Sequence, residues 1–220
     1  MKFDSRTLQI LKNFSTINPS ILFRVGDRLS TISLTRTVVA RAKLSDTVDK
    51  EFAVYDLNRF IGIMHLFNDP DITIHDKHLV VSNQDKSRQV NFTFADPSMV
   101  YAAPEKDISL DDCDIEFDLS NEVLQSINKG LSILQLPEIA ITGDGMNIYV
   151  KAIDVKNPTG DTYSYVVGKT DHNFQVVFKA ENMKLLGDNY KVKISKRIFA
   201  HFQSQDVEYF IQGETTSRFD

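Results

Sequence analysis

The sequence of 220 residues contains no tryptophan, a single cysteine and no long apolar run. One cysteine, Cys113, excludes an intramolecular disulfide framework and is typical of a reducing cytoplasm. No apolar stretch approaches the roughly 18 residues that a membrane helix needs. The N-terminal stretch MKFDSRTLQ has no apolar segment of the kind that signal peptides carry. We therefore expect a cytoplasmic protein with no membrane partner.

Motifs for catalysis and metal binding are also missing. There is no GxxxxGK phosphate loop and no HExxH pair. His75 and His78 stand three apart in a predicted strand, where their side chains would point to opposite faces, so we interpret them as part of a surface turn. The run DDCDIE suits magnesium in its chemistry, but a solvated linker is the simpler interpretation, and its carboxylates should raise the pKa of the Cys113 thiol. We expect no cofactor, no metal and no enzymatic activity.

Charge is distributed unevenly along the chain. The formal net charge is −5, from 25 basic and 30 acidic residues. Residues 105–118 hold seven acids and one base, so the rest of the chain has 24 bases (25 − 1) and 23 acids (30 − 7). Net charge is therefore a poor guide to partners. We interpret the acidic segment as a linker between two domains, 1–106 and 107–220.

Four segments have helical spacing of apolar residues, namely 5–18, 56–68, 120–134 and the short 179–188. Asp4, Ser5, Asp56 and Ser120 are candidate N-caps. Most of the remainder alternates with period two and predicts strands over 71–82, 88–95, 138–153, 164–168, 174–178, 189–195 and 206–213. Turn residues at 25–27 and 143–145 predict hairpins. The 15 Phe and 7 Tyr also favour a sheet-rich fold.

The order of these segments repeats. Each half has a helix, then strands, then a strand that leads into a helix, then strands. Residue pairs match in the same order: Leu8-Gln9 with Leu124-Gln125, Gly26-Asp27 with Gly143-Asp144, and Val54-Tyr55 with Val177-Phe178. An internal duplication explains this order. We predict an α+β fold of two similar domains, each with two helices packed on antiparallel sheet.

The polar faces of the four predicted helices are almost free of acids. They carry six bases: Arg6, Lys12, Arg59, Lys129, Lys179 and Lys184. If the fourth helix ends at Gly187, the four helices have three acids, Asp56, Glu122 and Glu181, and all lie in a first turn, where the helix dipole favours negative charge. Such faces suit contacts with nucleic-acid phosphates. The alternative is that they are ordinary solvated faces that lack acids by chance.

Four segments taken together resemble the sliding clamp of large tailed bacteriophages, the processivity factor of the phage DNA polymerase. They are LKNFSTIN (11–18), AVYDLNRFIGI (53–63), ADPS (95–98) and NMKLLGDNYKV (182–192). The resemblance covers nearly the whole chain and is closer in the first half. It implies two similar domains per chain and a head-to-tail homotrimeric ring whose helices line a hole for duplex DNA. It further implies a polymerase partner, an ATP-dependent clamp loader and the cytoplasm of the infected bacterial host.

The resemblance also suggests site residues. Lys12, Asn13 and Lys129 match positions that the family presents to DNA. Arg6, Lys179 and Lys184 extend this set from the helical faces, and Arg59 lies towards the flank of its helix. Clamps bind partner peptides in an apolar pocket near the interdomain linker, where Tyr101 is the candidate. An ordinary core or edge role for Tyr101 is the alternative.

The competing class is a phage β-rich protein that forms no ring, either structural or binding single-stranded DNA. A single-strand binder needs exposed aromatic residues interleaved with bases. Here the aromatic residues alternate as core residues do, as at Phe92 and Phe94 or at Phe174 and Phe178. The pattern therefore favours the clamp.

Overall fold

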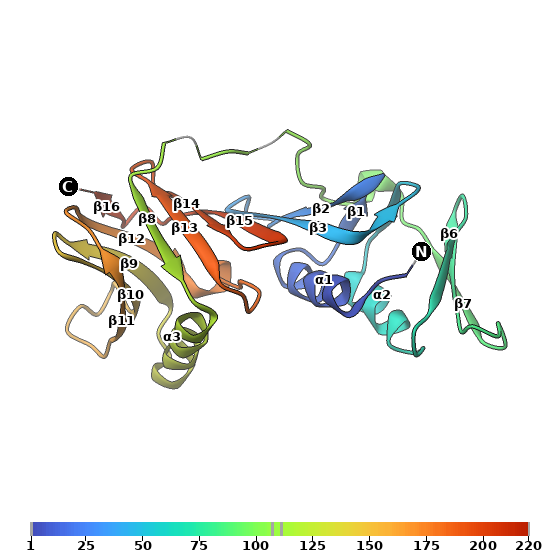
Figure 1. Cartoon of the computed structure of the whole chain (residues 1–220), viewed down its shortest axis with the longest axis horizontal. Helices are drawn as coiled ribbons and strands as arrows, with labels where there is room; N and C mark the ends of the chain where they lie inside the picture. Colours follow the sequence, from blue (N-terminus) through green and yellow to red (C-terminus); the bar gives the residue numbers. More distant parts are fainter. Residues whose placement is uncertain (1, 107, 111, 220) are drawn as a thin grey trace. The chain divides into compact units, whose positions relative to one another are not determined.

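The computed structural model describes residues 2–106, 108–110 and 112–219 (Figure 1). The chain divides into two compact units, Met1–Glu105 and Lys106–Asp220. In the described residues, no helix has the length and apolar character needed to cross a membrane.

Unit 1 combines two helices with three small antiparallel sheets. In chain order its elements are α1 (Ser5–Ile17), β1 (Ile21–Phe23), β2 (Gly26–Ile32), β3 (Val38–Val48), β4 (Phe52–Val54), α2 (Leu57–Met64), β5 (Asp71–Ile74), β6 (His78–Ser82), β7 (Gln89–Thr93) and the 3-10 turn η1 (Pro97–Met99). Within the unit, β1 pairs with β4, β2 with β3, and β6 with both β5 and β7.

Local signals explain where α1 begins and ends. The Asp4 carboxylate accepts a hydrogen bond from the Thr7 amide at 2.7 Å, which satisfies a free N–H of the first turn. The Asn18 amide closes the other end on the Phe14 carbonyl at 2.9 Å. Between them Ile10, Leu11 and Phe14 are buried, so one face of the helix joins the core and the opposite face is left for solvent.

The described residues of unit 2 form one α-helix and two groups of antiparallel strands. Its elements are β8 (Ile115–Leu119), α3 (Asn121–Leu134), β9 (Glu138–Asp144), β10 (Asn147–Ile153), β11 (Tyr163–Lys169), β12 (Asn173–Lys179), the 3-10 turn η2 (Ala180–Asn182), β13 (Tyr190–Ser195), β14 (Phe199–Gln203), β15 (Val207–Gln212) and β16 (Arg218–Phe219). One sheet has the order β11-β10-β9-β12-β16. In the other, β8, β13, β14 and β15 follow one another as antiparallel neighbours.

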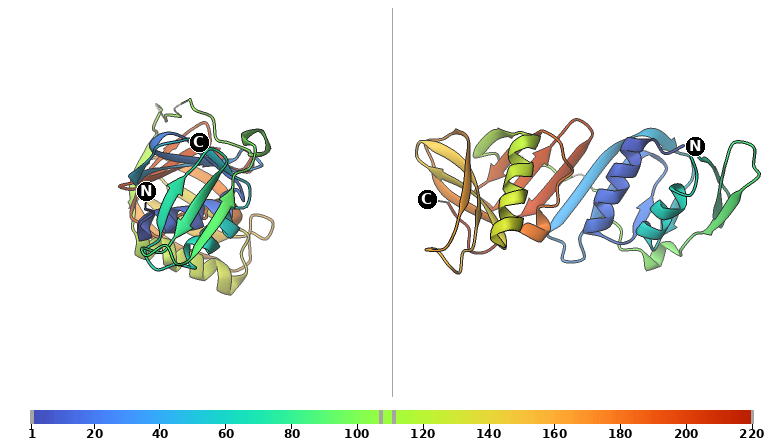
Figure 2. Two further views of the ribbon diagram at one scale, coloured as in Figure 1. Left: turned by 90° about the vertical axis from the view of Figure 1, so that its right-hand side faces the viewer. Right: turned by 90° about the horizontal axis from the view of Figure 1, so that it is seen from below.

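Helix α3 is capped by the Ser120 hydroxyl, which accepts from the Val123 amide at 3.3 Å. Gln135 ends it in the left-handed conformation (φ 52°). The helix packs against β10 and β11 (Figure 2). Its own residues Leu124 and Ile127 are buried. The helix expected over 120–134 is thus confirmed.

The helix expected over 179–188 is wrong. Strand β12 continues to Lys179, and only the three residues of η2 are helical before irregular backbone leads to β13. Met183 and Leu185 are both buried, whereas Lys184 between them is exposed. That burial has period two, which extended backbone satisfies and a helix does not. The second domain therefore has one α-helix and a 3-10 turn where two helices were expected.

Helix α2 is shorter than the expected 56–68. It ends at Met64, and the following amides of Leu66 and Phe67 bond back to the carbonyls three residues earlier. Such bonds tighten a helix end. Asp69 then adopts a positive φ of 51° directly before Pro70, a position at which helical backbone is disfavoured.

Three strand predictions also need correction. The segment 71–82 forms the hairpin β5–β6 instead of one strand. The turn at 25–27 joins two strands that pair elsewhere, β1 with β4 and β2 with β3, so no hairpin forms there. Strands β8 and β14 were not expected. The hairpin at 143–145 is confirmed between β9 and β10, with Gly145 at φ 79°.

Candidate nucleic-acid interface

The polar face of α1 lies opposite its buried residues. Lys12 is exposed, and Arg6 and Asn13 are half-buried on the same side of the helix. No acidic residue occupies the first turn. The three α1 residues expected to face DNA therefore share one surface.

Helix α2 adjoins this surface. The Ser15 hydroxyl of α1 donates to the Asn58 side-chain oxygen of α2 at 3.0 Å. Arg59 is exposed, as are Asn58 and Gly62, whereas Leu57 and Phe60 are buried. Arg59 therefore stands on the exposed face of α2 beside α1.

On α3 the exposed residues Glu122, Gln125, Lys129 and Ser132 recur at helical spacing. Lys129 lies in the middle of this face. Ile133 lies on the same side with 77% of its surface exposed. As on α1, the charge beyond the first turn is positive only.

Lys179 and Lys184 are exposed but do not lie on a helix. Lys179 ends β12, and Lys184 lies in the irregular segment between η2 and β13. The expectation that both lysines lie on the polar face of a helix is therefore wrong. Their segment does approach α3, because the Asn121 amide of the first turn donates to the Asn189 side chain at 2.8 Å.

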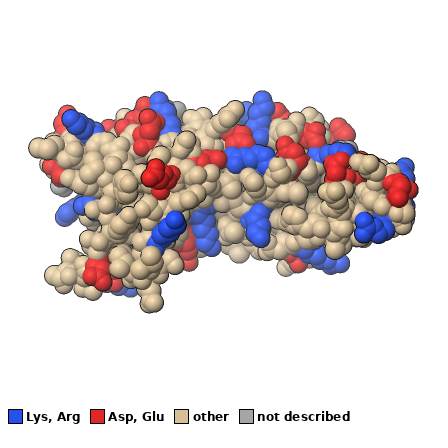
Figure 3. All heavy atoms as spheres, turned by 60° about the horizontal axis from the view of Figure 1, so that its bottom comes forward, with Lys and Arg blue, Asp and Glu red and all other residues tan. Residues whose placement is uncertain are grey.

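The basic side chains do not form a dense patch. Within the described ranges, the charged groups of Lys12, Arg59, Lys129 and Lys179 form no ion pair. On the face drawn in Figure 3, basic and acidic side chains are interspersed. Such a surface can attract phosphate without gripping it, since contacts of single cations with phosphate add only modestly to affinity.

Three acidic residues near the C-terminal end of the segment 105–118 form ion pairs. Asp112 pairs with Arg197 at 2.9 Å, and Asp114 accepts from the Lys196 amide at 2.8 Å and lies 3.5 Å from its ammonium. Glu116 lies in β8 and pairs with Lys191 at 2.7 Å. The C-terminal end of the expected linker is therefore part of a sheet, and its carboxylates partly neutralise neighbouring bases.

The structure also describes two sites that the sequence analysis considered, Cys113 and the pair His75 and His78. Burial first, and then the Glu116 carboxylate, raise the pKa of the Cys113 thiol, which confirms the direction expected from the carboxylates alone. The His75 and His78 rings stack at 4.7 Å across the β5–β6 turn, so the interpretation of these residues as part of a surface turn is confirmed. In the part of the chain that the structure describes, no three His, Cys, Asp or Glu residues are grouped to hold a metal ion.

Tyr101 is held at both ends. Its carbonyl accepts from the buried Asn18 side chain at 2.9 Å, and its hydroxyl accepts from the Arg36 guanidinium. The guanidinium carbon also stands 5.6 Å from the ring centroid. Leu34 and Met99, each two residues away in sequence from this pair, are 66% and 64% exposed. Tyr101 is therefore half-buried and fixed, with exposed apolar residues close to it in the chain.

Strand β11 forms an open edge that the sequence did not indicate as a site. In the described ranges it pairs with β10 alone, at the end of the five-stranded sheet. Tyr165 and Val166 are 38% and 56% exposed along it. The register with β10 shifts between Ile148 and Tyr149, so Val167 is an extra residue in a β-bulge.

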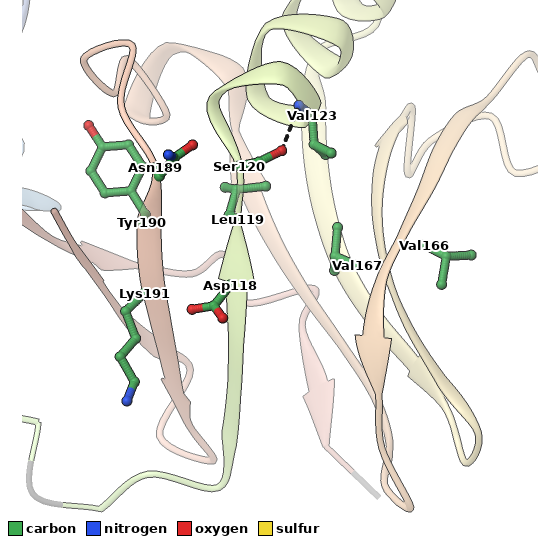
Figure 4. Close-up of a pocket in the computed structure, with 9 residues that line it drawn as sticks. All are labelled: Asp118, Leu119, Ser120, Val123, Val166, Val167, Asn189, Tyr190 and Lys191. Atoms are coloured by element: carbon green, nitrogen blue, oxygen red, sulfur yellow. Dashed lines mark hydrogen bonds between the residues drawn. The ribbon is translucent and has the colours of Figure 1, made fainter.

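A pocket of about 520 Å³ lies between this edge and the start of α3 (Figure 4). Val166 and Val167 line it from β11, and Leu119 and Val123 from the β8–α3 junction. Polar and aromatic side chains complete the lining: Asp118, Ser120, Asn189, Tyr190 and Lys191. The apolar run SYVVG predicted a strand, but its edge position and the pocket depend on residues far apart in sequence.

Comparison with known proteins defines the class first. Residues 2–101 match the family model described as "DNA polymerase processivity factor", and residues 116–215 match "gp45 sliding clamp, C terminal". The solved structure of proliferating cellular nuclear antigen from Entamoeba histolytica has the same fold, with a TM-score of 0.70 at 11% identity over 94% of each chain. The fold and the matched models are those of the DNA polymerase processivity factors.

Two relatives narrow this class. The sliding clamp of Escherichia phage RB69 is 32% identical over 230 residues and 100% of both chains. The sliding clamp of Vibrio phage KVP40 is 31% identical over 220 residues, 97% of this chain and 99% of the relative. The chain belongs to the phage sliding-clamp family.

Membership of this family tests several expectations from the sequence. The resemblance to phage clamps and the α+β fold of two clamp domains are confirmed. The family is a non-catalytic one whose members act with DNA and polymerase, so the expectation that the chain is not an enzyme is confirmed. Membership also decides against the competing class of ringless phage β-proteins.

Proposed function

We propose that three copies of this chain close head to tail into a ring around duplex DNA and tether the phage DNA polymerase. The observation that carries this proposal is the pair of acid-poor polar faces on α1 and α3. Each lies on the first helix of its unit. In such a ring the two units, with a boundary after residue 106, supply six similar domains.

Weak charge suits this function. A closed ring stays on DNA because it encircles it, so affinity for phosphate is not needed for retention. Sliding requires shallow contacts, many of them through water. Six bases in each chain become eighteen in a trimer (6 × 3). Helix α1, with 13 residues, spans about 20 Å, comparable to the width of a duplex.

The residues that we assign to the DNA-facing surface are Arg6, Lys12, Asn13, Arg59, Lys129, Lys179 and Lys184. Lys12 and Lys129 are supported by their exposed positions in the middle of helical polar faces. Lys179 and Lys184 are supported by exposure and by the contact of their segment with the first turn of α3. Tyr101 is our candidate for contact with a partner peptide, together with the exposed Leu34 and Met99.

The open edge of β11 supports assembly into a ring. An exposed apolar edge strand presents unpaired backbone groups that a second chain can satisfy. Loading requires a partner that opens the ring with ATP, because the sequence has no phosphate loop of its own. We place the protein in the cytoplasm of the infected host, where phage replication takes place.

The first experiment measures mass in solution at micromolar concentration by sedimentation. We expect a species of three times 25.0 kDa. A strict monomer at every concentration tested would contradict the ring.

The second experiment combines Lys12→Glu with Lys129→Glu and measures processive synthesis by the cognate polymerase. We expect product length to fall roughly tenfold, because six charges per ring are reversed to face phosphate, while the trimer remains intact. The matched control reverses Lys77 and Lys86, which are exposed on the β5–β6 and β6–β7 turns. If both double variants behave alike, the assignment of the DNA-facing residues is wrong.

A further inference from the structure

Tyr163, the first residue of β11, joins that strand to α3. Its hydroxyl lies 2.7 Å from the Ser126 hydroxyl, in the middle of the helix. One turn further along α3, the Tyr163 ring lies directly over Gly130. A Cβ atom built on Gly130 would stand only 2.7 Å from Cδ1 of the ring, so the contact depends on the absence of a side chain there.

Strand β11 has few other supports. Along its length it hydrogen-bonds to β10 alone among the described strands. Near its far end Gly168 lies against β8, where its Cβ position would be 3.5 Å from Cβ of Phe117. Between these two ends the pocket of about 520 Å³ lies beneath Val166 and Val167 (Figure 4). The strand is thus held at its two ends and poorly supported in the middle.

The two structures that Tyr163 connects have different proposed roles. The polar face of α3, with Lys129 next to Gly130, is the surface assigned to DNA. The free edge of β11, with Tyr165 and Val166, is the surface available to a neighbouring copy. Ser126 and Tyr163 are both half-buried, so their hydrogen bond is partly shielded from competing water.

We infer that Tyr163 is a positioning residue, which sets the free edge of β11 relative to α3 so that a second copy can pair with it. The inference rests on the proposed ring. Without the hydroxyl pair, the start of β11 still pairs with β10, but its contact with α3 depends on packing of the Tyr163 ring alone. The edge then fluctuates, and a neighbouring chain must order it on pairing, which weakens the interface.

The test uses Tyr163→Phe, Ser126→Ala and the double variant in the full-length chain. The readout is the rate at which labelled and unlabelled trimers exchange subunits. A hydrogen bond of this kind contributes about 1 kcal/mol, or roughly a fivefold change. We expect each single variant to speed exchange about fivefold and the double variant to be no faster, because the two changes remove one interaction.

Tyr149→Phe is the matched control. Tyr149 lies on the neighbouring strand β10, and its hydroxyl donates to the Asp144 carboxylate at 3.0 Å, away from α3. We expect this variant to exchange subunits at the wild-type rate even if its unfolding midpoint falls. Equal acceleration in Tyr149→Phe and Tyr163→Phe would reduce Tyr163 to an ordinary contributor to stability and overturn the inference.

The two proposals fail in different ways. A wild-type chain that never forms trimers contradicts the ring itself. A wild-type trimer whose exchange rate is unchanged by Tyr163→Phe and Ser126→Ala leaves the ring intact and refutes only the positioning role.

Discussion

Replacing Gly130 with alanine introduces a methyl group where α3 and β11 approach most closely. The new Cβ atom would stand 2.7, 3.0 and 3.2 Å from Cδ1, Cγ and Cβ of Tyr163. Non-bonded carbon atoms prefer about 3.5–4.0 Å, so the ring must withdraw by roughly 0.8 Å. The Tyr163 hydroxyl is bonded to Ser126 on the same helix, and this movement strains or breaks that bond.

The expected energy follows from three contributions. Alanine is favoured over glycine inside a helix by about 1 kcal/mol. Overpacking a close contact costs about 1–3 kcal/mol, and loss of the hydroxyl pair costs about 1 kcal/mol. The balance is a net loss of about 1–3 kcal/mol. Gly130→Ala should therefore destabilise a helix that its intrinsic propensity would stabilise.

Gly62 of α2 provides the control, because a Cβ atom built there meets nothing within 4 Å. Gly62→Ala should stabilise the protein by about 1 kcal/mol. Both variants are compared with the wild type by urea unfolding at one protein concentration, since assembly makes stability depend on concentration.

Stabilisation of Gly130→Ala to the extent of Gly62→Ala would refute the close contact. A second check adds Tyr163→Ala, which removes the ring. In that background Gly130→Ala should become stabilising.

Two further predictions concern single titratable groups. Hydrogen bonds lower the pKa of the Asp4 carboxyl, and the bond from the Thr7 amide has the largest effect. The stabilisation by this cap is therefore complete above the ordinary pKa of aspartate and is lost as pH falls through the lowered one. Asp4→Ala should lower the free energy of unfolding by about 1 kcal/mol at neutral pH. Asp4→Asn should keep the cap but reduce the dependence of urea unfolding on acid pH. An unchanged pH dependence in Asp4→Asn would contradict this prediction. Because the pKa of Cys113 is raised, its alkylation by iodoacetamide at pH 7.5 should be slower than that of a small free thiol, and a faster reaction would contradict the effect of burial.

The elements that sequence analysis identified correctly are those determined by nearby residues. In α1 and α3, a cap and an apolar stripe stand within one or two turns of each other, so the signal is local. The hairpin at 143–145 is local as well, because Asp144 and Gly145 favour a tight turn wherever they occur between two strands.

The errors arose where tertiary contacts decide. The segment around Lys184 has residues of good helical propensity, but the observed irregular backbone buries both Met183 and Leu185. Gly26 has the character of a turn, yet β1 pairs with β4 and not with β2. Local preference did not determine the outcome in either segment.

The residues of the candidate site likewise include some that local sequence predicts and some that it does not. The polar faces of α1 and α3 could be read from helical periodicity, and with them Lys12 and Lys129. The contact of Tyr163 with Ser126 spans 37 residues, and the pocket under β11 draws its lining from several separate segments. No short pattern encodes such contacts, so they required the structure.

The bulge at Val167 has a consequence for an unassembled copy. Bulges bend an edge strand and increase its twist, and a twisted edge is a poor template for the indefinite addition of flat strands that leads to fibrils. A neighbouring strand of matching curvature can still pair with β11. The bulge therefore permits pairing with the correct partner and disfavours pairing with flat strands. A newly synthesised chain is thus protected from aggregation through the same strand that a closed ring would cover.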